Sequence, residues 1–121
     1  MIVEDEPRNA KLLRDLFQKF GYETMEAVDG EQGIAVARLR RPDIILMDIM
    51  MPKLDGYEAT KVLKADIFTS SIPIIALTAN AMRGDKEQLL DSGFNGYIAK
   101  PFDIRELLHT VEQYLTGEII A

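Results

Sequence analysis

The sequence contains no cysteine and no tryptophan, and His109 is its only histidine. A chain without cysteine forms neither disulfides nor thiolate metal sites, and it has no thiol nucleophile. No apolar run approaches the roughly 18 residues that a membrane-spanning helix needs, and the amino end lacks the basic segment of a secretory signal. These absences predict a cytoplasmic protein that uses neither thiol chemistry nor a membrane.

An excess of positive charge is also missing. The chain has 14 lysines and arginines against 20 aspartates and glutamates, which gives a formal net charge of −6. A field of that sign repels nucleic acid backbones, so DNA and RNA are not expected as partners. Apolar residues make up 47% of the chain and charged residues 28%, which is ordinary for a soluble globular protein. We expect one domain, residues 1–121, with a single core and no output domain.

The glycine-rich loops that bind nucleotides are absent as well. No Walker-type phosphate loop is present, and Gly30 and Gly33 do not have the spacing of a dinucleotide-binding loop. A flavin-binding protein of α/β topology would need a Ser/Thr/Gly-rich loop after its first strand, and this chain lacks one. His109 falls off the apolar stripe of the last predicted helix, so we interpret it as a solvated side chain rather than a phosphohistidine or a metal ligand.

Short apolar runs alternate five times with helical patterns. The runs predict strands at 1–3, 22–28, 44–47, 72–77 and 97–99, because such runs between turn signals are typical of strands buried on both faces of a parallel sheet. Helical spacing predicts helices at about 7–20, 34–41, 56–64, 80–92 and 103–115, with Val62 and Ile104 among the buried residues. The alternation predicts an α/β fold with a doubly wound, five-stranded parallel sheet and five helices.

Polar residues stand where four of these strands end. The first run ends in Glu4 and Asp5, the third in Asp48, the fourth in Thr78 and the fifth in Lys100. The carboxyl ends of parallel strands meet at one edge of a sheet, which is where open α/β sheets bind their ligands. Carboxylates gathered there repel one another unless a cation neutralises them, and hard oxygen ligands favour Mg²⁺. With a lysine and a hydroxyl nearby, the set predicts phosphoryl transfer to a carboxylate nucleophile, Asp48.

The chain resembles the receiver domain of two-component response regulators from Ile2 to about Leu115. The matching segments are V-E-D-E (3–6), L-M-D-I-M-M-P with D-G (46–52 and 55–56), A-L-T-A (76–79) and Y-I-A-K-P-F (97–102). The resemblance implies the flavodoxin-like strand order 2-1-3-4-5.

The resemblance also implies roles for the residues at the strand ends. Asp48 would be the phosphoacceptor. Glu4, Asp5, Asp48 and the backbone carbonyl of Met50 would hold Mg²⁺, and Lys100 would contact the phosphoryl group. The phosphoryl donor would be a histidine kinase or a histidine phosphotransfer protein.

Further residues are implied as parts of a switch. Thr78 would hydrogen-bond a phosphoryl oxygen after transfer, and Tyr97 would be the rotating aromatic that reports the state of the site. The bond between Lys100 and Pro101 would be cis. The exposed face of the fourth helix, fifth strand and fifth helix would then change and alter binding to a downstream protein.

Two other interpretations compete with a stand-alone receiver. A Mg²⁺-dependent phosphohydrolase with an aspartyl nucleophile often has a second aspartate two residues later, where this chain has Met50, which cannot transfer protons. We therefore expect no enzymatic activity beyond self-phosphorylation and slow self-dephosphorylation.

The segment 72–85 resembles both DivK-like single-domain regulators and the receivers of hybrid histidine kinases. The initial methionine favours the single-domain type.

One departure from the family concerns the first strand. Family members carry several more residues before I-V-E-D, whereas here only Met1 precedes Ile2. The first strand lies inside the sheet in this family, so we expect it to be short of pairing and burial. The prediction is either reduced stability or a true start upstream.

Overall fold

The computed structural model describes residues 1–79 and 85–116. The first part of the predicted fourth helix, 80–84, lies outside them. The strands are β1 (Ile2–Val3), β2 (Glu26–Ala27), β3 (Ile45–Asp48), β4 (Ile74–Thr78) and β5 (Gly96–Ala99). They form one five-stranded sheet in the order β2-β1-β3-β4-β5, and every neighbouring pair is parallel. The predicted fold class and strand order are confirmed.

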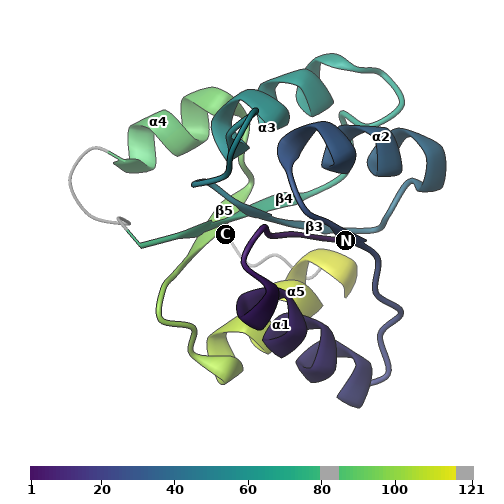
Figure 1. The fold of residues 1–121 in the computed structure, drawn as a ribbon, viewed down its shortest axis with the longest axis vertical. Coiled ribbons are helices and arrows are strands. Elements are labelled where there is room, and N and C mark those ends of the chain that lie inside the picture. Colours follow the sequence, from purple (N-terminus) through teal and green to yellow (C-terminus); the bar gives the residue numbers. More distant parts are fainter. Residues whose placement is uncertain (80–84, 117–121) are drawn as a thin grey trace.

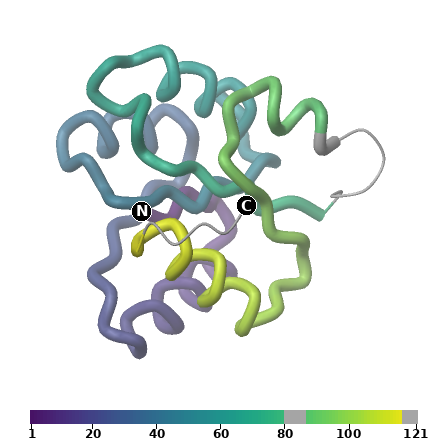
Figure 2. The backbone as a smooth tube through the Cα atoms, turned by 180° about the vertical axis from the view of Figure 1, so that it is seen from behind, coloured from purple at the N-terminus to yellow at the C-terminus, as the bar shows by residue number. Residues whose placement is uncertain are grey.

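The helices cover both faces of this sheet. They are α1 (Pro7–Lys19), α2 (Gly30–Arg40), α3 (Gly56–Ala65), α4 (Asp85–Ser92) and α5 (Ile104–Thr116). Figure 1 shows α2, α3 and α4 above the sheet and α1 and α5 below it. The view from behind in Figure 2 shows α5 in front of α1 on the same side of the sheet, and one buried cluster contains residues of both helices. None of the described helices is long and apolar enough to cross a membrane.

Acidic side chains cap the amino ends of several of the helices. Asp29 and Asp55 cap α2 and α3 by accepting hydrogen bonds from the backbone three residues on. Glu6 does the same for α1, and Pro7 occupies the first position of that helix. Asp103, the predicted cap of the last helix, accepts from the backbone N–H groups of Arg105 and Glu106 at 2.9 and 3.3 Å. The loops before these helices are therefore fixed by local chemistry.

The core lies on both faces of the sheet because side chains alternate along each strand. One buried cluster joins Ile45 and Met47 of β3 to α2, α3 and α4. The other joins Leu46 and Ile75 to α1 and α5. All of β3, including Asp48 at its end, is buried.

Three details differ from the sequence-based expectations. The predicted strand 22–28 is a strand only at Glu26–Ala27, because its one neighbour, β1, offers two residues for pairing. Val62 is 45% exposed because α3 buries Ala59 and Leu63, and Val62 lies about 100° around the helix from Leu63. Ile104 is 51% exposed, because the buried stripe of α5 begins at Leu107.

The first strand is short, as predicted, but the expected lack of burial is wrong. Met1, Ile2 and Val3 are 8%, 3% and 0% exposed. The Met1 ammonium donates to the Ile44 carbonyl at 2.7 Å, and the Met1 carbonyl accepts from the Leu46 N–H at 2.8 Å. Met1 therefore extends the hydrogen bonding between β1 and β3 by one residue, and it does so with its terminal amino group inside the protein.

Candidate functional site

Three carboxylates meet at the carboxyl edge of the sheet. Val3 pairs with Met47 across β1 and β3, so Glu4 and Asp48, one position further on, are neighbours. Glu4, Asp5 and Asp48 each offer an oxygen, and these oxygens all lie within 4.8 Å of one another. Among residues 1–79 and 85–116 this is the only group of three potential metal ligands.

Lys100 brings a cation to the same place from the far side of β4. Its backbone N–H donates to the Thr78 carbonyl at 2.8 Å, which continues the pairing of β4 with β5 by one residue. Its ammonium group donates to Asp48 Oδ1 at 3.0 Å and lies 3.6 Å from Glu4 Oε1. The Lys100–Pro101 peptide bond is cis.

Glu4 has the least favourable environment for a charged carboxylate in this cluster. It is 2% exposed, and its Oε1 accepts no hydrogen bond from any described residue. Burial, followed by the nearby Asp48 carboxylate, raises the pKa of Glu4 to about 8, while Lys100 and the Glu6 N–H oppose the rise. At neutral pH the Glu4 carboxyl therefore holds a proton in the metal-free protein.

The cluster fits a divalent cation. The buried Glu4 Oε1, which accepts no hydrogen bond from the described residues, is available as a metal ligand. Asp5 adds an exposed carboxylate on the solvent side. Oxygen-only ligands with access to water are those that Mg²⁺ prefers, because this ion keeps part of its hydration shell. The predicted ligands Glu4, Asp5 and Asp48 are thus together.

The loop after Asp48 is held close to the strand end. The Met50 N–H donates to Asp48 Oδ1 at 3.3 Å, and the Gly56 N–H donates to the Ile49 carbonyl at 2.9 Å. The Met50 side chain is 77% exposed.

Two glycines allow this loop to approach the strand end. A Cβ atom on Gly56 would lie 2.4 Å from the Asp48 carbonyl oxygen, and one on Gly30 would lie 2.5 Å from the Leu54 carbonyl oxygen. Either clash would push the loop away from the site. The pair Asp55-Gly56 was a visible signal, since an acid before a glycine is typical of a tight turn into a helix.

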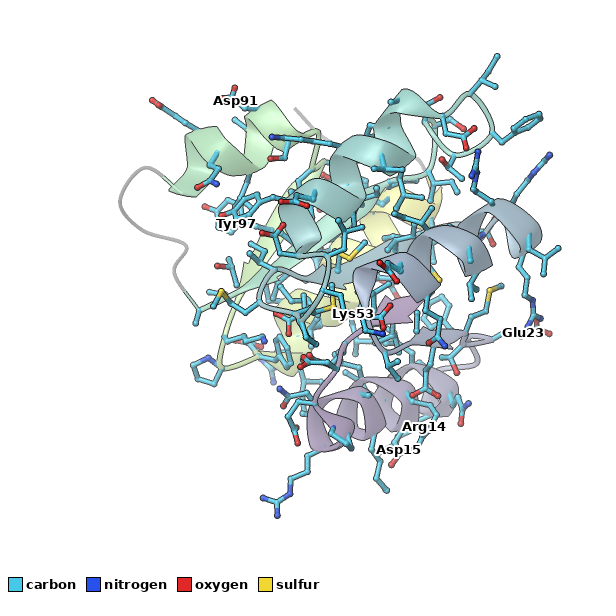
Figure 3. The ribbon with its side chains drawn as sticks, turned by 45° about the horizontal axis from the view of Figure 1, so that its top comes forward. Arg14, Asp15, Glu23, Lys53, Asp91 and Tyr97 are labelled. Atoms are coloured by element: carbon cyan, nitrogen blue, oxygen red, sulfur yellow. The ribbon has the colours of Figure 1, made fainter. Side chains whose placement is uncertain are left out.

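Thr78 and Tyr97, the two predicted switch residues, lie on β4 and β5, the first and second strands beyond β3. Asp48 pairs with Leu77, so Thr78 projects one position beyond Asp48 at the same edge, and it is 5% exposed. Tyr97 pairs with Ala76, two positions before Thr78, and is 37% exposed. Figure 3 shows Tyr97 on the side of the molecule where α4 lies. His109 is exposed on α5, in agreement with its interpretation as a solvated side chain.

The chain matches a known family and known relatives. The response regulator receiver domain family matches residues 1–112. The polar-differentiation response regulator DivK of Brucella anthropi is 46% identical over 115 residues, which cover 95% of this chain and 94% of that protein. DivK of Brucella ovis is 45% identical over the same length and coverage.

Solved structures agree with this match. The receiver domain of a sensor histidine kinase from Pseudomonas aeruginosa is 41% identical with a TM-score of 0.89, covers 95% of this chain and 94% of its own, and has a magnesium ion coordinated in its active site cleft. A chemotaxis response regulator of Vibrio cholerae is 30% identical with a TM-score of 0.89, over 94% of this chain and 95% of its own. The chain therefore belongs to the response regulator receiver domain family.

Proposed function

We propose that Asp48 accepts a phosphoryl group from a phosphohistidine of a histidine kinase or a histidine phosphotransfer protein. The observation that carries this proposal is the convergence of Glu4, Asp5, Asp48 and Lys100 at one edge of the sheet. Residues from three separate parts of the chain form one acidic site with a single lysine, and the site is open to solvent on the Asp5 side.

Mg²⁺ is the proposed cofactor, held by Glu4, Asp5, Asp48 and the Met50 carbonyl. When bound, it would neutralise charge on the oxygens of the transferring phosphoryl group. Magnesium in the active site cleft of the similar Pseudomonas receiver domain supports this assignment.

Asp48 is the nucleophile of the proposed reaction. One of its oxygens forms the new bond to phosphorus while the P–N bond of the donor breaks, and the imidazole leaves with that electron pair and takes up a proton. The Lys100 ammonium lies 3.0 Å from Asp48 Oδ1. It would stabilise the negative charge on a phosphoryl oxygen during the transfer. The Met50 N–H, which donates to the same carboxylate, holds it in position.

The output of the switch follows from added charge. An aspartyl phosphate carries about two negative charges where the carboxylate carried one, and it brings three acceptor oxygens beside Thr78. Thr78 lies one position beyond Asp48 on the neighbouring strand. Its hydroxyl would turn toward the phosphoryl oxygens. Tyr97 then changes position, and the α4–β5–α5 face presents a different surface to a downstream protein.

The proposed chemistry stops at the chain's own phosphorylation and slow dephosphorylation. Met50 occupies the place of the general acid and base that aspartyl phosphohydrolases use, and its exposed thioether cannot move protons. We also propose a cytoplasmic location, in agreement with the absence of a membrane-spanning helix from the described residues.

The test uses a small phosphodonor and three versions of the chain. With acetyl phosphate and Mg²⁺, intact-mass measurement should show one added phosphoryl group on the unchanged chain and none on Asp48→Asn. Asp43→Asn is the control, because Asp43 is an exposed aspartate at the opposite end of β3 and should be labelled normally. Undiminished, Mg²⁺-dependent labelling of Asp48→Asn would refute the assignment.

A further inference from the structure

The start of α2 carries two buried glycines, Gly30 and Gly33. They are three positions apart and therefore share one face of the helix. We name it the glycine face of α2. This face touches two separate parts of the proposed metal site. One is β1, which leads into Glu4, and the other is the loop between β3 and α3, residues 49–55, which carries Met50.

Gly33 packs against Val3, the residue before Glu4. A Cβ atom on Gly33 would lie 3.1 and 3.2 Å from the two γ-methyl carbons of Val3, so Val3 would have to move by a few tenths of an ångström. Val3 is fully buried, and the Glu4 N–H donates to the Ala27 carbonyl at 3.0 Å. The backbone of Glu4 is therefore held directly by the end of β2 and, through Val3, by α2.

Gly30 packs against the backbone of the β3–α3 loop. A Cβ atom on Gly30 would lie 2.5 Å from the Leu54 carbonyl oxygen. A different side-chain rotamer cannot relieve a clash with a backbone atom, so the loop itself would have to shift. The Gly56 N–H closes this loop by donating to the Ile49 carbonyl at 2.9 Å. A shift at Leu54 would therefore also displace Met50, whose carbonyl is a proposed metal ligand.

An ion pair adds a weaker tie between α2 and the loop. The Lys53 ammonium lies 3.8 Å from Oδ2 of Asp29, the residue before Gly30 (Figure 3). The lysine side chain is 65% exposed, and exposed pairs of this kind contribute little. Close packing at the glycine face, rather than charge, is therefore what holds β1 and the loop in their relative positions.

We propose that Gly30 and Gly33 are positioning residues that fix the metal ligands relative to one another and thereby favour Mg²⁺ over Ca²⁺. Mg²⁺ requires near-ideal octahedral geometry with oxygen ligands at about 2.0–2.1 Å, whereas Ca²⁺ accepts irregular shells at about 2.3–2.6 Å. A displacement of a few tenths of an ångström therefore penalises Mg²⁺ more than Ca²⁺. The inference rests on the proposed Mg²⁺ site and assigns the origin of its selectivity.

The test is a calorimetric titration of the metal-free chain and its variants with MgCl₂ and, separately, with CaCl₂ at pH 8. Gly30→Ala should weaken Mg²⁺ binding by about tenfold or more, which is the loss typical of residues that orient metal ligands. It should change Ca²⁺ binding by less than about threefold. Gly33→Ala should act in the same direction by a smaller factor, because the Val3 side chain can yield in part.

Second substitutions separate positioning from a general loss of stability. Val3→Ala should restore Mg²⁺ binding to Gly33→Ala, because it removes both methyl groups and leaves only a Cβ atom at 3.8 Å. Leu54→Ala should not restore Gly30→Ala, since the backbone oxygen remains. The control is Val111→Ala, which truncates a buried valine in the cluster on the other face of the sheet. It should lower stability and leave both affinities unchanged.

Three results would overturn the proposal: unaltered Mg²⁺ affinity in both glycine variants, equal losses of Mg²⁺ and Ca²⁺ binding, or no recovery when Val3→Ala is added to Gly33→Ala. If circular dichroism shows that Gly30→Ala does not fold, the Gly33→Ala and Val3→Ala pair decides the question. An unchanged chain that binds no Mg²⁺ would refute the proposed metal site and this inference with it. Normal binding by the unchanged chain together with unaltered variants would refute the inference alone.

Discussion

The Lys100 ammonium lies between Asp48 and Glu4, 3.0 Å from Oδ1 of the first and 3.6 Å from Oε1 of the second. Both carboxyl groups are almost fully buried, whereas the lysine side chain is 24% exposed. Within the described residues it is the only cation paired with either of them. The metal-free site thus depends on one lysine to offset negative charge that a divalent ion would offset more fully.

Replacing Lys100 with methionine should destabilise the metal-free protein. The substitution keeps an apolar stem but leaves two buried carboxyl groups without a cation, and an unpaired buried charge is costly. We expect the free energy of unfolding, measured by urea denaturation in EDTA, to fall by about 2 kcal/mol. Millimolar Mg²⁺ should recover part of this loss.

The matched control is Lys11→Met. Lys11 also forms a short ion pair, 2.6 Å from Asp15, but both side chains are more than half exposed. Such a pair contributes less than about 0.5 kcal/mol, so this variant should unfold almost as the unchanged chain does. Equal effects of the two substitutions would mean that burial does not govern the Lys100 interaction.

Glu4→Gln should stabilise the metal-free protein at alkaline pH and weaken Mg²⁺ binding. The Glu4 pKa is raised to about 8 from its ordinary 4.5. The folded state therefore holds this proton more tightly than the unfolded state, and the stability that results is lost as the pH rises through 8. Glutamine removes that loss, so at pH 9 in EDTA the variant should be more stable by about 1–2 kcal/mol.

In Mg²⁺ the unchanged chain should be more stable than Glu4→Gln. At pH 8 the ion binds the unchanged chain more tightly, so a Mg²⁺ titration followed by thermal unfolding should favour glutamate over glutamine at position 4. Glu112→Gln, on the exposed side of α5, should follow the unchanged chain throughout. A glutamine variant that binds Mg²⁺ with unaltered affinity would exclude Glu4 as a ligand.

The fold and the carboxyl-edge site could be predicted because their determinants are local in sequence. Each strand is a short apolar run, and the polar residue that ends it is adjacent in the chain, so parallel pairing alone places Asp48 and Lys100 at one edge. The Glu4–Lys100 contact could not be predicted in detail. It depends on how the side chain of Lys100 crosses β4 to reach β1 and β3.

The contact between Arg41 and Phe68 illustrates what sequence patterns miss. Basic residues at the end of a predicted helix, such as Arg38, Arg40 and Arg41, are typically interpreted as complementing the helix dipole, and nothing in that pattern refers to Phe68. Arg41 has a positive φ of 43°, which turns the chain at the end of α2, and only this turn brings its guanidinium over the Phe68 ring. The burial of Met1 is similar, because Met1 belongs to a cluster with residues far away in the sequence, among them Ala37 of α2 and Ile45 of β3.

The Met1 amino group should make stability depend on pH between 6 and 8. Burial lowers the pKa of this ammonium from 8.0 to about 6, against the opposing charge of Asp43. The unfolded chain then binds the proton more tightly than the folded chain, so the free energy of unfolding rises by about 2 kcal/mol from pH 6 to pH 8. Glu4 acts in the opposite direction over the same range, so the two contributions partly cancel in the metal-free protein.

An N-acetylated chain isolates the contribution of Met1. Its amide N–H still donates to the Ile44 carbonyl but carries no charge, and a cavity of about 440 Å³ bordered by Met1 has room for the acetyl group. The acetylated chain should be more stable at pH 6, and this advantage should shrink by about 2 kcal/mol at pH 8. An advantage that stays constant with pH would show that the amine does not titrate in this range.

Extending the first strand should stabilise the protein further. Two apolar residues added before Met1 move the ammonium out of the interior and place side chains against the cavity that Phe17, Leu46 and Val111 help to line. Burying one large aliphatic side chain contributes about 2 kcal/mol, offset by about 1–2 kcal/mol for each residue that becomes ordered. At pH 6, where burial of the Met1 amine costs stability, its removal from the interior tips the balance, and we expect a net gain of about 2 kcal/mol, or several degrees in the midpoint of thermal unfolding. Two added serines displace the ammonium without adding apolar surface, so they should give about half of this gain. If neither extension raises the midpoint, the short β1 strand does not limit the stability of the domain.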